Sequence, residues 1–321
     1  MISWILLVVG FAALVWGADC FVKGASALAR RLGVSPLLVG LTVVAFGTSA
    51  PELAVSVTAA VQGANGIAVG NVLGSNLFNL LVVAGLSAVL CPLVMDRALL
   101  RRDWPLSLAA AVLLTVFLAR DLHLSRLEGL ILLAAFAAVL AAQIRAALRE
   151  RTGAADGADD GEATMQPLLI AVNIVVGLVC IVAGGQGAVN GATGIARMFG
   201  LSEQLIGLTI VAVGTSLPEL VTSLVAARRG QNEIAMGNVI GSNLFNILLI
   251  LGTSAAISPI TVAPATIADC LVLIAATVVF YLPALRGRLG RLCGAVMALV
   301  YVLYTVCLIL RDTGAVVFPT L

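Results

Sequence analysis

The sequence has 321 residues, of which 61% are hydrophobic and only 11% are charged, with a formal net charge of +2 and a mean hydropathy of +1.13. Soluble domains carry about a quarter charged residues, so this composition excludes a soluble domain as the body of the chain. The net charge is too small to indicate a nucleic-acid partner. Apolar stretches of membrane-spanning length recur from end to end, and we therefore expect an all-α membrane protein.

Ten apolar stretches predict ten transmembrane helices. The first has no positive residue before it, so it is predicted to be a retained helix and not a cleaved signal peptide. In chain order the stretches lie at residues 2–22, 36–62, 66–91, 104–119, 126–149, 167–193, 203–228, 232–257, 266–284 and 291–310.

One long polar segment, residues 150–166, separates five predicted helices from five more. It is rich in Gly, Ala and Asp, which is typical of a flexible connection. Its Asp and Gly spacing does not match a helix–loop–helix calcium site, so a solvated linker is favoured. The sequence thus predicts a first five-helix repeat at 1–149, a hinge at 150–166 and a second, inverted repeat at 167–321.

The positive charges predict the orientation in the membrane. Connections that follow the odd-numbered helices hold fourteen of the eighteen Lys and Arg residues, and the other connections hold Arg120, Arg126, Arg197 and Arg311. Short loops rich in Lys and Arg stay in the cytoplasm. We therefore expect a multi-pass protein of the cell (inner) membrane, with a cytoplasmic hinge and both termini outside the cytoplasm.

An internal repeat is the main signal in the sequence. Residues 40–85 and 207–252 are identical at twenty-nine of forty-six positions, without a gap, at an offset of 167. Five predicted helices separate equivalent points, and because five is odd the two copies enter the membrane in opposite directions. Inverted repeats of this kind are typical of secondary transporters. Shared polar residues at membrane depth indicate a function, because they cost free energy in lipid unless they are used.

The repeat contains GTSAPE at residues 47–52. Pro51 has no N–H and its ring crowds the preceding turn, so we expect a kinked or unwound helix that exposes backbone carbonyls. Thr48 and Ser49 lie four and three residues before Glu52, on the same helical face. The second copy repeats this arrangement with Thr215, Ser216, Pro218 and Glu219.

The following helix contains GSNLFN, at residues 74–79 and again at 241–246. Ser75 and Asn79 lie on one face, whereas Asn76 lies on another side and is predicted to make interhelical hydrogen bonds. The second copy repeats these residues as Ser242, Asn246 and Asn243. Close helix contact is predicted at the glycines spaced i,i+4, which are Gly70, Gly74, Gly237 and Gly241.

All these groups are hard oxygen ligands, which suit calcium or sodium. Two glutamates give the site a charge of −2, which one calcium ion or two sodium ions would neutralise. The single histidine, His123, has no plausible ligand partners, and no C-x-x-C pair is present. The sequence therefore predicts no zinc, haem or other cofactor, only transported ions.

These doubled motifs closely resemble the two alpha repeats of the sodium/calcium exchanger family, in the cation/calcium exchanger superfamily and of its compact prokaryotic type. The resemblance implies a secondary active antiporter, not an enzyme, that exchanges calcium for sodium by alternating access. Glu52 and Glu219 would bridge calcium with help from the main-chain carbonyls of Thr48 and Thr215. The implied metal ligands are Ala45 (carbonyl), Thr48, Ser49, Glu52, Ser75, Asn79, Ala212 (carbonyl), Thr215, Ser216, Glu219, Ser242 and Asn246.

The chain departs from the family pattern in two places. Some relatives have an aspartate at one of the positions of Asn79 and Asn246, whereas here both are Asn. By resemblance, Asn79 argues against the potassium-dependent branch, and Asn246 bears on how the cavity handles sodium or protons. The hinge is also short, without the large cytosolic calcium-sensing domains of animal exchangers.

Other functions are compatible with parts of the pattern. The runner-up is a calcium/proton antiporter, because two nearby carboxylates can also carry protons. A passive channel is disfavoured by the duplicated acids, and an intramembrane enzyme by the lack of a Ser/His pair or an aspartate dyad at membrane depth. Outside the motifs, Asp19 and Asp269 are expected to be solvated or to make local hydrogen bonds. The bilayer and the ions are the expected partners, with no obligate protein partner.

Overall fold

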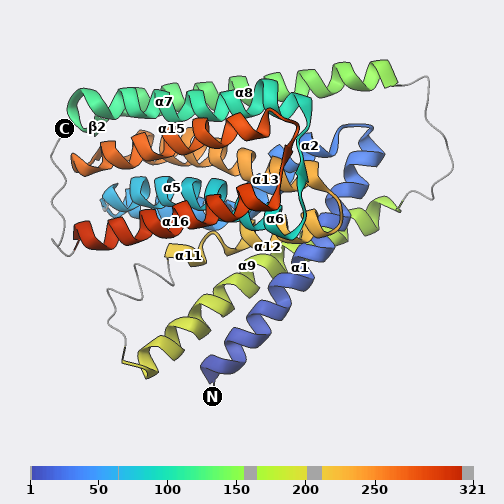
Figure 1. Cartoon of the computed structure of the whole chain (residues 1–321), viewed down its shortest axis with the longest axis horizontal. Helices are drawn as coiled ribbons and strands as arrows, with labels where there is room; N and C mark the ends of the chain where they lie inside the picture. The colour runs from blue at the N-terminus through green and yellow to red at the C-terminus, as the bar shows by residue number, and fades with distance from the viewer. Residues whose placement is uncertain (1, 64, 155–164, 201–211, 313–321) are drawn as a thin grey trace.

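The computed structural model of the chain describes residues 2–63, 65–154, 165–200 and 212–312 (Figure 1). The part before the hinge consists of α1 (Ile2–Leu32), α2 (Pro36–Val39), η1 (Gly40–Val44), α3 (Ala45–Thr48), α4 (Ala50–Val61), α5 (Asn65–Phe78), η2 (Asn79–Val83), α6 (Ala84–Leu90), β1 (Leu93–Val94), η3 (Leu99–Asp103), α7 (Trp104–Asp121), β2 (His123–Leu124) and α8 (Arg126–Ala154). The part after it consists of α9 (Pro167–Met198), α11 (Ala212–Gly214), α12 (Leu217–Arg228), α13 (Asn232–Leu244), η5 (Phe245–Leu251), α14 (Gly252–Ile257), β3 (Ile260–Thr261), α15 (Ala265–Ala284), β4 (Arg288–Leu289) and α16 (Arg291–Asp312). The segments labelled η are π-helical turns within longer helices.

The described residues contain eight helices that are long and apolar enough to cross a membrane. A ninth span results if the bent pair Pro36–Thr48 and Ala50–Val61 is counted as one. The chain is thus a mostly helical, multi-pass membrane protein. The ten-helix count is not reached among these residues, because the span predicted at 203–228 falls partly on 201–211, outside the described part.

Two central spans carry the two copies of the GSNLFN motif. Over their most apolar eighteen residues, Asn232–Ile257 is 94% buried and Ala68–Leu90 is 78% buried, whereas Arg291–Arg311 is only 11% buried. The outer helices therefore turn apolar side chains toward lipid and enclose the two central spans. This arrangement keeps the polar residues of both GSNLFN copies away from the bilayer.

Helices α1 and α9 form a tilted pair that runs at an angle to the rest of the bundle in Figure 1. Their contact is lined by glycines seven residues apart. A Cβ atom added at Gly17 would lie 2.8 Å from the carbonyl oxygen of Gly177, and one added at Gly10 would lie 2.8 Å from that of Gly184. Only glycine allows the two backbones to approach this closely.

Two pairs of short antiparallel strands connect the halves, and the sequence did not predict them. In the first pair, β1 lies against β4, with Leu93 opposite Leu289. In the second, β2 lies against β3, with Leu124 opposite Ile260. Each pair joins one loop of the first half to one loop of the second half, so both pairs fix the halves to each other at the ends of the helices.

Candidate functional site

Both copies of the proline motif interrupt a helix. In the first copy the axis bends by 50° between Thr48 and Ala50, and Ser49 adopts φ −84° and ψ 5°. In the second copy α11 ends at Gly214 and α12 begins at Leu217. The predicted break is confirmed, but it lies before each proline, because a proline fits the first turn of a helix, where its N–H is not needed.

The two glutamates occupy the first turn of the helix that follows each break. Glu52 lies in α4 and Glu219 in α12, and their exposed fractions are 1% and 0%. The N-terminal end of a helix carries a partial positive charge, which stabilises a nearby carboxylate. The fold therefore holds two acids at depth next to two helix N-termini.

The serine of each proline motif contacts the glutamate of the other half. The hydroxyl of Ser49 donates a hydrogen bond of 2.8 Å to Oε1 of Glu219. The hydroxyl of Ser216 lies 3.3 Å from Oε1 of Glu52 and 3.1 Å from the hydroxyl of Ser75. These five residues, predicted from segments far apart in the sequence, thus lie together in one buried cluster.

A second set of contacts supports the glutamate of the second half. The hydroxyl of Thr48 lies 3.0 Å from Oδ1 of Asn238. The amide of Asn238 donates 3.3 Å to the main-chain oxygen of Glu219 and 2.9 Å to the hydroxyl of Ser223. Asn238 thus joins the broken helix of one half to that of the other.

The equivalent position in the first half is Asn71, whose amide donates 3.2 Å to the hydroxyl of Ser56. Sequence reasoning did not single out Asn71 or Asn238. The sequence did contain a signal for them, because both are intramembrane asparagines at equivalent places of the repeat. The asparagines predicted as ligands share this property. Their contacts hold each broken helix against the helix that follows it.

Four asparagines meet where the two central spans cross. The amides of Asn76 and Asn243 each donate to the main-chain oxygen of the other, at 3.2 and 3.3 Å, which confirms the predicted interhelical bonds. The amide of Asn79 donates 3.3 Å to Oδ1 of Asn243, and that of Asn246 donates 2.9 Å to Oδ1 of Asn76. The π-helical turns η2 and η5 start at or just before Asn79 and Asn246, and such turns are frequent at functional sites.

Several buried oxygens of the predicted site lack a hydrogen-bond partner among the described residues. Neither Glu52 nor Glu219 has an ion-pair partner in the described part of the chain. Uncompensated buried oxygens of this kind are costly unless a cation or a proton is bound. The atoms are Oε2 of Glu52, Oε2 of Glu219, Oδ1 of Asn79, Oδ1 of Asn246, Oγ of Ser242 and Oγ1 of Thr215.

The predicted ligands Ala45 and Ala212 would act through their main-chain carbonyls. The carbonyl oxygen of Ala45 accepts the N–H of Ser49 at 3.0 Å and lies 3.4 Å from the hydroxyl of Thr48. Ala212 is the first residue of α11.

The predicted close helix contact is confirmed at Gly241, where an added Cβ would lie 2.7 Å from the Cβ of Ala45, and at Gly237. No comparable contact occurs at Gly70 or Gly74 among the described residues.

The acids outside the motifs make local contacts, as predicted. Asp19 pairs with Lys23 at 2.8 Å and with Arg229. Asp269 pairs with Arg311 at 3.0 Å and accepts from the hydroxyl of Tyr304. Both clusters lie apart from the two glutamates of the motifs.

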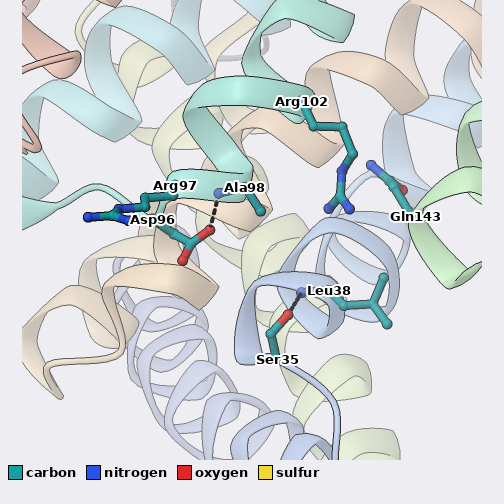
Figure 2. Close-up of a pocket in the computed structure, with 7 residues that line it drawn as sticks. All are labelled: Ser35, Leu38, Asp96, Arg97, Ala98, Arg102 and Gln143. Atoms are coloured by element: carbon teal, nitrogen blue, oxygen red, sulfur yellow. Dashed lines mark hydrogen bonds between the residues drawn. The ribbon is translucent and has the colours of Figure 1, made fainter. Parts of the chain in front are cut away.

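A separate polar cavity of ≈ 260 Å³ does not include the site. Figure 2 shows it with Ser35 and Asp96 capping helical turns, where they accept from the main-chain N–H groups of Leu38 and Ala98. Arg102 also lines this cavity and pairs with the buried Asp103 at 3.0 Å. The full lining is Ser35, Leu38, Asp96, Arg97, Ala98, Arg102 and Gln143.

Comparison with known proteins agrees with this geometry. A family model described as sodium/calcium exchanger protein matches residues 2–145 and 169–310. The "Putative antiporter CaxA" of Alkalimonas amylolytica is 41% identical over 318 residues, covering 95% of this chain and 98% of that protein. The "Sodium/calcium exchanger MaX1" of Methanosarcina acetivorans is 36% identical, covering 82% and 85%. A structure of the sodium-calcium exchanger NCX_Mj, soaked with zero Na⁺ and Ca²⁺, has a TM-score of 0.84 and 31% identity, covering 96% of this chain and 99% of that one. The chain therefore belongs to the sodium/calcium exchanger family.

Proposed function

We propose that the protein is a secondary active antiporter of the cell (inner) membrane that exchanges calcium for sodium by alternating access. One observation carries the proposal. Two buried carboxylates from opposite halves, Glu52 and Glu219, each keep an oxygen without a partner among the described residues. Hydroxyl and amide oxygens surround them, which is the chemistry that calcium and sodium prefer.

The proposed calcium ligands are the carboxylates of Glu52 and Glu219 and the main-chain carbonyls of Thr48 and Thr215. Sodium would use the same carboxylates with the neutral oxygens around them. The full proposed set is the twelve residues Ala45, Thr48, Ser49, Glu52, Ser75, Asn79, Ala212, Thr215, Ser216, Glu219, Ser242 and Asn246. Its unpaired oxygens support this assignment.

The charge of the site supplies a reason for coupling. Two ionised carboxylates held at depth without a cation are strongly disfavoured. One calcium ion or two sodium ions cancel the charge of −2, so the loaded site is more easily enclosed by protein than the empty, ionised site. The change of access to the site from one membrane face to the other would then require a bound ion. One kind of ion would therefore exchange for the other.

We propose ten spans, as two inverted repeats at 1–149 and 167–321 joined by the hinge at 150–166. The pairing of β1 with β4 supports this number, because it puts Val94 and Arg288 on one side of the membrane. An even number of crossings must then separate them, and the described residues between them supply five. One further crossing is needed between α9 and α13, where the seventh span was predicted. The five described spans are Leu99–Asp121, Arg126–Ala146, Pro167–Met198, Asn232–Ile257 and Ala265–Ala284.

We further propose that both termini lie outside the cytoplasm. In Figure 1, α8 ends and α9 begins at one end of the bundle, whereas α16 ends at the opposite end, where β2 also lies. The pairing of β1 with β4 also brings the arginines that flank these two strands to one face of the membrane. The positive-inside rule requires such a concentration of arginines at a cytoplasmic face. A reporter fused to the C-terminus should be exported, and one inserted at 150–166 should stay in the cytoplasm. A cytoplasmic C-terminus would overturn the ten-span arrangement.

A calcium/proton antiporter is the second candidate, because the unpaired oxygens of Glu52 and Glu219 could also bind protons. Calcium uptake into proteoliposomes separates the two candidates. A sodium gradient imposed at equal pH should drive uptake, and a pH gradient imposed without sodium should not. The reverse result would replace sodium by protons in the proposal.

A further inference from the structure

The four asparagines at the crossing of the central spans form a closed set of hydrogen bonds. Asn76 and Asn243 hold each other through their main-chain oxygens. The remaining side-chain oxygen of each accepts the amide of a residue from the opposite half, Asn246 and Asn79 respectively. The exposed fraction of each of the four side chains is 2% or less, so water does not compete for these groups.

This set of bonds decides which way two of the amides point. A carboxamide has a donor NH₂ end and an acceptor oxygen end, and only the NH₂ end can face another oxygen. Because the NH₂ group of Asn246 is bound to Oδ1 of Asn76, its own oxygen must point to the other side. In the same way, the NH₂ group of Asn79 is bound to Oδ1 of Asn243, so the oxygen of Asn79 must also point to the other side. Both of these oxygens are buried and have no partner among the described residues.

We infer that Asn76 and Asn243 are positioning residues that fix the amides of Asn246 and Asn79 with their oxygens, and not their NH₂ groups, available to the ion. The inference rests on the proposed function. A flipped amide would remove a ligand and turn a partial positive charge toward a cation at low dielectric. Each amide is held by the opposite half, so neither half orients its own asparagine ligand.

A double-mutant cycle tests this relation, with equilibrium binding of radiolabelled calcium, and its displacement by sodium, measured on the purified protein. Asn76→Ala should weaken ion binding by about tenfold, as expected for the loss of one hydrogen bond and the orientation that it enforces. In an Asn246→Ala background the same change should add less than about twofold, because the amide that it orients is gone.

The same-half pair is the matched control. Asn76→Ala leaves the main-chain oxygen of Asn76 in place, so Asn243 keeps its bond and continues to hold Asn79. The effects of Asn76→Ala and Asn79→Ala should therefore multiply. Asn173→Ala removes an amide that donates to Leu169 within its own helix and should leave ion binding unchanged.

Independent effects of Asn76→Ala and Asn246→Ala would overturn the inference, and so would equal coupling of Asn76 to Asn246 and Asn79. If Asn76→Ala does not yield folded protein, the mirror cycle of Asn243 with Asn79 gives the same test. Wild-type protein that binds calcium but shows no sodium-driven exchange would overturn the proposed function and leave the cycle decisive. Wild-type protein that binds no calcium would overturn both.

Discussion

Glu52 and Glu219 occupy equivalent places in two copies of one sequence, yet their surroundings differ. Glu219 receives a hydrogen bond of 2.8 Å from Ser49. The matching hydroxyl of Ser216 lies 3.3 Å from Glu52 and is shared with Ser75 at 3.1 Å. The carboxylate of the second half is therefore held more tightly than that of the first.

The threonines also differ, and here the residue of the first half has the closer contact. The hydroxyl of Thr48 lies 3.0 Å from Oδ1 of Asn238, whereas that of Thr215 has no partner among the described residues. Because Thr, Ser and Glu occupy equivalent positions in both copies, the residues of the motif alone do not account for the difference. We interpret it as a property of one conformation, and in the opposite conformation of an alternating-access cycle the two half-sites would exchange surroundings.

The largest expected effect comes from removing either charge. Glu52→Gln and Glu219→Gln keep the size of the side chain but leave calcium with a residual positive charge at low dielectric, which costs about 3–5 kcal/mol. Sodium-driven calcium exchange should fall to background in each variant, despite their different surroundings. Asp19→Asn removes an acid of the partly exposed ion pair and should have little effect. Near wild-type exchange by Glu52→Gln would show that the site does not need two carboxylates.

Acid pH should have the next largest effect. Protonation neutralises the two glutamates and removes the negative charge that calcium needs, so exchange should weaken as the pH falls from about 8 to about 5. The measurement is the initial rate of sodium-driven calcium uptake with equal pH on both sides of the membrane. A flat profile would mean that neither glutamate binds protons in this range.

Neutral ligands should matter less than the carboxylates. Asn79→Ala and Asn246→Ala each remove one uncharged oxygen, at a cost of about 1–3 kcal/mol. Both variants should keep measurable calcium transport but require a different sodium concentration for half-maximal exchange. Complete loss of calcium transport in correctly folded Asn246→Ala would show that this asparagine is as necessary for calcium transport as the glutamates, which would contradict the prediction.

The smallest effects distinguish the two explanations of the asymmetry. Ser49→Ala and Ser216→Ala each remove one hydroxyl that contacts a glutamate, which should weaken calcium binding by about tenfold. If the difference between the half-sites belongs to one conformation, the two variants should lose a similar fraction of sodium-driven calcium exchange, which averages over the full transport cycle. A consistently larger loss for Ser49→Ala would show that the asymmetry is built into the protein.

The sequence predicted the elements that depend on local chemistry. Apolar stretches identified the spans that the described residues contain, and Pro51 indicated the broken helix. The shared helical face of Ser49 and Glu52 stays a prediction, because the helix is interrupted at Ser49. The sequence could not predict contacts that depend on how the halves fit together. The two-residue strands such as β1 carry no alternating pattern of their own, and they exist only because the packed helices bring the loops together.

The contacts between the halves were also only partly predictable. Asn76 and Asn243 were expected to bond across helices, because their spacing put them on a face away from the other polar residues. Asn238 was missed because its partners, Thr48 and Ser223, come from both halves and no sequence spacing relates them. Polar residues that repeat at membrane depth deserve equal weight, even where they are not next to a proline or an acid.

Calcium uptake into proteoliposomes, driven by an imposed sodium gradient, tests the central claim most directly. Wild-type protein should accumulate calcium when sodium is higher inside the vesicles, and the uptake should stop when the gradient is abolished. Vesicles with Glu52→Gln or Glu219→Gln, reconstituted at the same protein content, should match protein-free vesicles. Calcium uptake that proceeds equally without a sodium gradient, or that survives the loss of either glutamate, would contradict this account.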